Sequence, residues 1–337
     1  MLPMSREFDP ENPSNPYASE SSGNPYAATR HSSSSPKSNG LFGDLTHQIR
    51  ESEFQLEDIL RVSVALYRRY AKELGGAALV FAVALGVLNY AAFQQIMEWL
   101  IIETLRDPET RPDIDLLMKI IEPRAPTLMA LSAATLVTQA LLMLYTVLRT
   151  NERCTKLDRA EDASSTLQTA LGKLPRYTGL LFVAYFAVLA GLLLCVVPGI
   201  VLAIHFSLLA AIVAIGGKGF DAFPRAFAIL KGRVFRTASV IIVTYVAIHI
   251  VPLLISSVYA AYIPQLIDEA VAANPGLSEE EIARALLESP TYYLLTQLPG
   301  TIAGALLTSF LGVATTVMYL NFTRDEAQDR ELTATRD

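Results

Sequence analysis

The stretch GFDAFPRAFAILKGRVFRT, residues 219–237, lies between two long apolar segments and carries four basic residues and four phenylalanines. Phe220, Phe223 and Phe227 follow a three-then-four spacing, which places them on one face of a helix. In a helix that lies in the membrane plane, aromatic residues enter the acyl boundary while the cations meet headgroups. The stretch therefore predicts an in-plane helix between two membrane-spanning helices.

The composition supports a membrane protein. Hydrophobic residues make up 52% of the 337-residue chain and charged residues 18%, with a mean hydropathy of +0.35. A spanning helix needs about 20 predominantly apolar residues. Six segments meet this length and contain no Lys or Arg: 75–97, 126–148, 177–197, 198–216, 237–262 and 298–320.

Internal repetition predicts the architecture. A basic residue, two intervening residues and a second basic residue precede spans one, three and five, as RYAK (69–72), KLPR (173–176) and RVFR (233–236). An amphipathic stretch precedes each of these motifs. Spans two, four and six begin near Pro126, Pro198 and Pro299, and proline suits the first turn of a helix. We therefore predict an all-α, polytopic six-helix transmembrane bundle, built from three repeats of an in-plane amphipathic helix plus a helical hairpin.

The charged residues between the spans indicate the orientation. Lys and Arg are concentrated before span one, between spans two and three, between spans four and five, and after span six. Since Lys and Arg are retained on the cytoplasmic side, both termini should be cytoplasmic. We expect a multi-pass protein of the cytoplasmic (inner) membrane.

The two ends of the chain differ from the middle. Residues 1–48 are rich in Ser, Asn and Pro and contain no apolar core of a signal peptide, so we expect a disordered polar tail. The membrane domain should cover residues 49–321. Residues 322–337 should form a cytoplasmic C-terminal tail.

The basic residues of the second and third repeats are candidates for contacting anionic lipid headgroups. They are Lys173, Arg176, Arg225, Lys231, Arg233 and Arg236. The alternative is that these cations only fix the orientation and have no preference for a lipid.

Span six carries a stripe of small residues that recur every four positions, which lets another helix approach closely. The candidate packing residues are Gly300, Gly304, Thr308 and Gly312. We expect this stripe to contact helices of the same chain. Homodimerisation through span six, or contact with another membrane protein, is the alternative.

Residues 205–237, together with LPR at 174–176 and VVPGIVL at 196–202, resemble the membrane domain attached to some bacterial glycerophosphoryl diester phosphodiesterases, and its stand-alone relatives of unknown function. Ala226 departs from the serine expected before the aromatic residue. The resemblance implies no catalytic residue, and the catalytic domain of those enzymes is absent from this sequence.

The sequence gives little support to an enzyme. His205 and His249 are the ionisable candidates within the spans, and neither has an Asp, Glu or Cys at helical spacing in its own span. We expect no cofactor, no metal site and no nucleic-acid partner, because the required spacings are missing. The lipid bilayer is the expected partner. We predict a non-enzymatic scaffold or lipid-organising module; the alternatives are a transporter or conduit for a small solute or amphiphile, and an activity on lipids.

Overall fold

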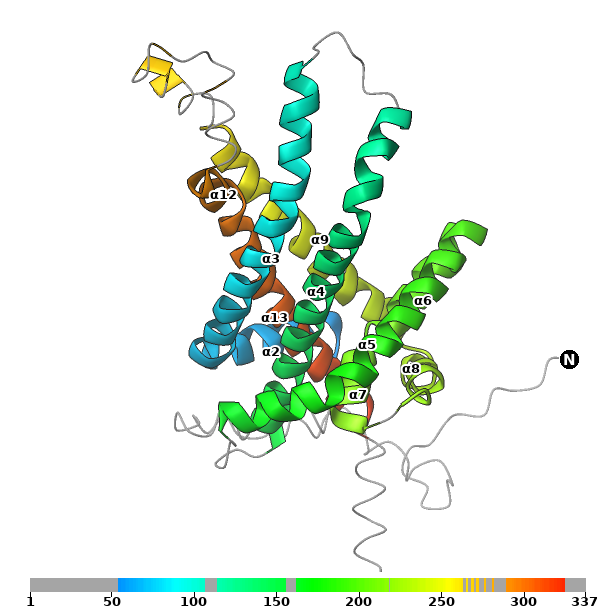
Figure 1. Cartoon of the computed structure of the whole chain (residues 1–337). Helices are drawn as coiled ribbons and strands as arrows, with labels where there is room; N and C mark the ends of the chain where they lie inside the picture. Colours follow the sequence, from blue (N-terminus) through cyan, green and yellow to red (C-terminus); the bar gives the residue numbers. More distant parts are fainter. Residues whose placement is uncertain are drawn as a thin grey trace, which may run out of the picture. The chain divides into compact units, whose positions relative to one another are not determined.

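The computed structural model describes residues 54–106, 114–155, 162–217, 219–262 and 289–324, together with a few positions between 265 and 281. Within these residues the regular structure is helical and no strand occurs. Figure 1 shows the helices α2 (Leu56–Arg69), α3 (Ala71–Arg106), α4 (Ile114–Thr155), α5 (Ala163–Leu194), α6 (Val196–Phe206), α7 (Leu209–Gly216), α8 (Ala222–Leu230), α9 (Val234–Ala260), α12 (Pro290–Thr296) and α13 (Leu298–Phe322). The predicted tails, 1–48 and most of 322–337, lie outside the described residues.

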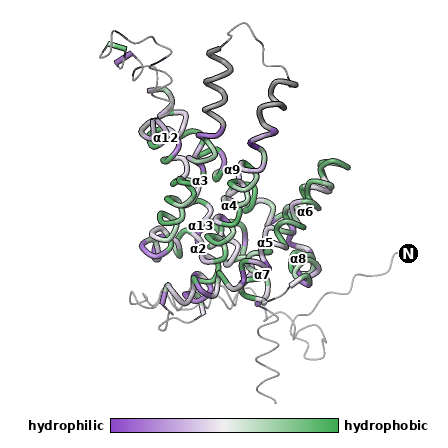
Figure 2. Tube along the Cα trace, in the orientation of Figure 1, coloured by the Kyte–Doolittle hydropathy of each residue, from purple (hydrophilic) through white to green (hydrophobic). Residues whose placement is uncertain are grey.

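Six segments of the described chain are long and apolar enough to cross a membrane. They are Ala71–Gln95, Glu122–Thr155, Ala163–Leu194, Val196–Gly216, Val234–Tyr259 and Leu298–Phe322. Each overlaps one of the six predicted spans, so the prediction of an all-α polytopic bundle is confirmed. Figure 2 shows hydrophobic residues along the spans, including the tip of the α5–α6 hairpin, and hydrophilic residues at several of the other ends.

The second amphipathic stretch differs from the prediction. It is not a separate helix, because α5 runs without interruption from Ala163 through Pro175 to Leu194. A proline inside a helix removes one backbone hydrogen bond and bends the helix. In Figure 1 α5 changes direction along its length. In the second repeat, the amphipathic stretch and the span are therefore joined by a bend within one helix. In the other two repeats a turn joins two separate helices.

Span four also differs, because it is two helices rather than one. The turn at Ser207 and Leu208 separates α6 from α7. The Ser207 hydroxyl donates to the Ile204 carbonyl at 2.7 Å, a hydroxyl-to-backbone bond of the kind that bends helices. Pro126, predicted to begin span two, instead lies inside α4 with Pro123. The prolines before spans four and six do lie in first turns, Pro198 in α6 and Pro299 in α13.

The three repeats pack in a cyclic order. Each repeat has an outgoing span (α3, α5 or α9) and a return span (α4, α6–α7 or α13). Each outgoing span contacts its own return span and also the return span of the preceding repeat: α3 with α13, α5 with α4, and α9 with α6. The separate amphipathic helices follow the same rule, since α2 contacts α13 and α8 contacts α6 and α7. The repeat predicted from the sequence is thus present in the packing.

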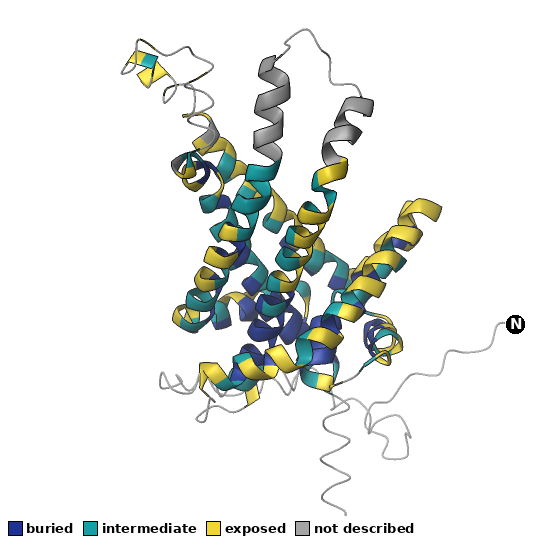
Figure 3. Cartoon of the chain, in the orientation of Figure 1, coloured by how far each residue is buried: buried dark blue, intermediate teal, exposed yellow. Residues whose placement is uncertain are grey.

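The buried core lies where the three return spans meet. α4, α7 and α13 contact one another, and their fully buried side chains include Leu142, Leu144, Val147, Leu209, Ile212, Val213, Val317 and Met318. Figure 3 shows these buried segments gathered toward one end of the bundle. We name that end, where α2 and α7 lie, the inner end, and the opposite end the outer end.

The outer halves of the spans are less buried. The hairpin of α5 and α6 exposes large apolar side chains, among them Phe182, Phe186, Leu193 and Val197. Its two helices approach closely because both carry glycine at the crossing, where a Cβ on Gly191 would lie 2.9 Å from the Gly199 Cα. Such an apolar surface matches the hydrocarbon core of a bilayer.

Candidate functional site at the inner end

The cations of the KLPR motif bind the end of the return span in the same repeat. The Lys173 ammonium donates to the Ala214 carbonyl, and Arg176 Nη1 donates to the Gly217 carbonyl at 3.1 Å. Gly217 ends α7 in a left-handed conformation, with φ of 63°. The last carbonyls of a helix lack intrahelical donors and carry partial negative charge. Lys173 and Arg176 satisfy these carbonyls, which ties α5 to α7.

The RVFR motif makes the equivalent connection in the third repeat. Arg233 Nη1 donates to the carbonyl of Phe322, the last residue of α13, at 3.0 Å. The guanidinium carbon also lies 5.2 Å from the centre of the Phe322 ring, which adds a cation–π contact. The cation that precedes α9 therefore binds the end of α13.

The first repeat makes this connection with the charges exchanged. The outgoing span α3 supplies a carboxylate, and the return span α4 supplies the cations. Glu73, which directly follows the RYAK motif, accepts hydrogen bonds from Arg149 Nε at 3.0 Å and from Arg153. Arg149 is 6% exposed and also donates to Glu152 at 3.2 Å. Buried charge of this kind requires opposite charge close by. Thr166 of α5 donates to Glu152 at 3.0 Å, so the network extends to the second repeat.

Each repeat thus joins the start of its outgoing span to the inner end of its return span. We name these three connections the inner clasps: Glu73 with Arg149 and Arg153; Lys173 and Arg176 with the end of α7; and Arg233 with the end of α13. Sequence reasoning missed Glu73, Arg149, Glu152 and Arg153 as a group. The available signal was the i, i+3, i+4 spacing of Arg149, Glu152 and Arg153 on a helix.

The remaining headgroup candidates lie around α8. Lys231 is exposed in the turn that follows α8, whereas Arg225 and Arg236 are partly buried. Phe220 and Phe235 are exposed, and Phe235 reaches 91% exposure. The segments that flank α8 therefore expose one lysine and two apolar rings.

The other two phenylalanines of the opening stretch contact rings of α6. The Phe223 ring lies 5.0 Å from Phe206, and the Phe227 ring stacks on His205 at 4.2 Å between centroids. Phe223 is half-buried, so only part of its ring is open to the acyl boundary. Phe227 contacts His205 with one face of its ring and remains 40% exposed. Ala226 is fully buried on α8, a helix that contacts α6 and α7.

The small-residue stripe of α13 contacts two helices of the same chain. A Cβ on Gly300 would come within 3.0 Å of the Pro252 carbonyl oxygen in α9, and a Cβ on Gly312 within 2.9 Å of Thr146 in α4. Gly304 also faces Pro252, at 3.7 Å. Thr308 donates to the Gly304 carbonyl of its own helix at 2.8 Å.

Both histidines bond to carbonyls of their own helices. His205 is buried and its Nδ1 lies 2.7 Å from the Val201 carbonyl oxygen. His249 is exposed, with Nδ1 2.9 Å from the Tyr245 carbonyl oxygen and its ring 4.1 Å from the Tyr245 ring. Within the described residues, no three His, Cys, Asp or Glu side chains gather as metal ligands would.

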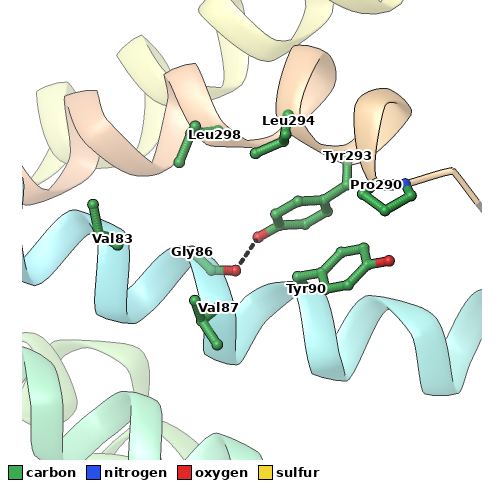
Figure 4. A pocket seen from close by; sticks show the side chains of 8 residues that line it. All are labelled: Val83, Gly86, Val87, Tyr90, Pro290, Tyr293, Leu294 and Leu298. Carbon is green, nitrogen blue, oxygen red and sulfur yellow. Dashed lines mark hydrogen bonds between the residues drawn. The ribbon is translucent and has the colours of Figure 1, made fainter.

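Cavities lie at the outer end. One of about 230 Å³ lies between α3 and α12, and Figure 4 shows Tyr90 and Tyr293 facing each other in it. The Tyr293 hydroxyl donates to the Gly86 carbonyl at 3.0 Å. Burial raises the pKa of Tyr293, so the phenol stays a neutral donor through the physiological range.

Comparison with known proteins found no matching family model, no similar curated protein and no similar solved structure.

Proposed function

We propose that this integral membrane protein is a non-enzymatic scaffold that organises lipids in the cytoplasmic membrane, with both termini in the cytoplasm. Contact with a lipid bilayer follows from the six spans. The orientation is supported by the inner clasps, since their cations all lie at one end of the bundle, and cytoplasmic ends retain Lys and Arg.

The observation that carries the lipid proposal is the exposed side of α8. Lys231 is exposed in the turn after α8, and Phe220, just before α8, and Phe235, near the start of α9, are exposed as well. Exposed apolar rings beside a cation suit the boundary between acyl chains and anionic headgroups. The clasps hold this surface in place, because Arg233 is tied to α13 only two residues after Lys231.

The six candidate headgroup-contacting cations differ in what they bind within the protein. Lys173, Arg176 and Arg233 each bind a helix end, whereas Lys231 extends into the surroundings. We therefore assign the main anionic contact to Lys231, with Arg225 and Arg236 contributing charge nearby.

Lipid retention in nanodiscs tests this proposal. The protein is placed in equimolar phosphatidylglycerol and phosphatidylethanolamine with matched acyl chains, and native mass spectrometry measures the lipids that remain bound. A cation near an anionic surface contributes about 1 kcal/mol, so Lys231→Gln should lower phosphatidylglycerol retention about fivefold. Lys72→Gln, which removes an exposed cation in the first turn of α3 instead of the one after α8, is the matched control. Equal retention in wild type and Lys231→Gln would overturn the proposal.

A transporter or conduit is the second candidate function, and one observation favours it. Span four is broken at Ser207 and Leu208, next to the buried His205. Broken helices and repeated units are typical of transport proteins. Flux into vesicles that depends on Ser207 and His205 would support this candidate over the scaffold.

We also propose kinship with the membrane domain of glycerophosphoryl diester phosphodiesterases. The support is the residues of the resemblance, since KLPR ties α5 to α7 and VVPGIVL forms the first turns of α6. An experimental structure of such a domain with the same three clasps would test the kinship.

A further inference from the structure

The outer end of the bundle has a concave surface that differs in chemistry from the inner end. A cavity of about 490 Å³ is lined by three tyrosines, Tyr259, Tyr262 and Tyr292, and by one carboxylate, Glu269. A second cavity, of about 510 Å³, lies between α9 and α13 and is lined by apolar residues including Ile255, Pro299 and Leu306. Tyr259 lines both cavities, so the two share a wall.

The first cavity has the composition of an ammonium site. Aromatic faces attract cations, and quaternary ammonium groups are bound in cages of aromatic rings. The Glu269 carboxylate adds negative charge to the same concavity. We name the four residues Tyr259, Tyr262, Tyr292 and Glu269 the outer cage. Among the described residues of this lining, Glu269 carries the charge, so the lining favours a ligand group with positive charge.

One wall of the outer cage is held in place by contacts to α3. Tyr293, the neighbour of Tyr292 on α12, is buried and hydrogen-bonds to the Gly86 carbonyl, as Figure 4 shows. The Tyr292 ring stacks on Phe93, with centroids 6.2 Å apart. These contacts fix the orientation of α12, so the Tyr292 ring is positioned before any ligand arrives.

The second cavity has the depth of an acyl-chain groove. Its lining on α13 extends from Pro299 to Leu306, and seven residues of helix rise ~10 Å. One leaflet of hydrocarbon is about 15 Å thick, half of a bilayer core. The groove therefore covers most of the leaflet at the outer end, directly beside the cage.

We propose that the outer cage and the adjoining groove together bind one phospholipid whose headgroup carries an ammonium. The ammonium lies among the three tyrosine rings and Glu269, and one acyl chain lies in the groove between α9 and α13. The site deepens the proposed lipid-organising function and rests on it, since it assigns a zwitterionic lipid to the end opposite the anionic contact at Lys231.

Tyrosines at a membrane surface also form a general aromatic belt, which has no headgroup preference. The belt accounts for each ring singly. It does not account for three rings and a carboxylate lining one cavity that adjoins an apolar groove. If the rings form only a belt, loss of any one exposed tyrosine should have the same effect on lipid retention. If they form a site, loss of a ring that lines the cavity should have the larger effect.

The same nanodiscs, with equimolar phosphatidylethanolamine and phosphatidylglycerol, separate the readings by native mass spectrometry. Loss of one ring or of the carboxylate should lower phosphatidylethanolamine retention about 2- to 5-fold, so Tyr262→Leu and Glu269→Gln should each do so. Tyr245→Leu is the matched control, because Tyr245 lies on α9 outside the lining of both cavities, and Tyr245 and Tyr262 are both 57% exposed. Equal effects of Tyr262→Leu and Tyr245→Leu, or no effect of Glu269→Gln, would overturn the site.

Two further measurements test the groove and the source of the ammonium. Ala303→Phe fills the groove and should reduce retention of the lipid, whereas unchanged retention would overturn the acyl-chain assignment. Soluble phosphoethanolamine, which has no acyl chain, should not displace the lipid; displacement would mean that the cage takes a free amine instead. Lys231→Gln should lower the retention of phosphatidylglycerol and leave that of phosphatidylethanolamine unchanged. The proposed function at the inner end and the outer cage can therefore be refuted separately.

Discussion

Replacing Gly312 with alanine should separate α4 from α13 at the centre of the buried core. The added methyl group would lie 2.9 Å from Thr146 Cβ and Cγ2 and 3.5 Å from Met143 Sδ. Carbon atoms pack best at about 3.5–4.0 Å, so the helices must move apart by roughly half an ångström or more. Thr146 is fully buried and its hydroxyl lies 3.3 Å from that of Ser309, so it has little room to yield.

The magnitude follows from two opposing terms. Overpacking of a tight contact costs about 1–3 kcal/mol. Alanine also favours the helix over glycine by about 1 kcal/mol. Gly304→Ala, on the same helix, gains the same helical preference but meets only Pro252 Cγ at 3.7 Å, an ordinary contact. The difference between the two variants therefore isolates the steric term, about 1–3 kcal/mol.

The assay is the free energy of unfolding in detergent micelles, measured for both variants and the wild type under identical conditions. Gly304→Ala should match or slightly exceed the wild type, and Gly312→Ala should be less stable than Gly304→Ala. If the two alanine variants are equally stable, the close packing of α4 on α13 has been misjudged.

Three other predictions concern the inner clasps, the orientation and the oligomeric state. Glu73→Gln should lower the free energy of unfolding by about 1–2 kcal/mol, because it removes one charged partner of the buried Arg149. The cost stays modest because Glu73 itself is partly exposed. An unchanged free energy of unfolding would show that this clasp does not stabilise the fold. A reporter fused after Lys231 should be active on the cytoplasmic side, and periplasmic activity would reverse the proposed orientation. Gly304→Cys, on a background in which Cys195 is replaced by serine, should give no crosslinked dimer in native membranes, because Pro252 of the same chain covers Gly304; a dimer would favour the intermolecular alternative.

The spans and the repeat could be predicted from the sequence because both are local or periodic properties. A long apolar run is sufficient to indicate a spanning segment, and all six runs are helical, with the fourth divided into α6 and α7. The RYAK, KLPR and RVFR motifs marked three equivalent positions, each of which takes part in or adjoins an inner clasp.

The breaks in helices were less predictable. Pro175 lies inside α5 and Pro126 inside α4, although proline more often begins or ends a helix. The turn at Ser207 depends on a side-chain hydrogen bond to Ile204 that competes with the regular backbone pattern. Composition alone does not distinguish such a serine from one inside a continuous helix.

The sites required tertiary structure. Glu73 and Arg149 are 76 residues apart in the sequence, and nothing local pairs them. The outer cage combines residues from the end of α9, from beyond it and from α12. The carbonyls that Lys173 and Arg176 bind lie 41 residues away on another element, so the sequence alone does not reveal these contacts.

The cyclic packing has a consequence for how the chain is made. The ring closes between its first and last members: α2 and α3 contact α13, and the Phe54 backbone N–H donates to the Asn321 side chain at 3.2 Å. During synthesis from the N-terminus, the helices that emerge first must wait in the bilayer for the one that emerges last. A chain truncated before residue 298 would leave α2, α3 and α4 without a shared neighbour, and quality-control proteases should remove it faster than the complete chain.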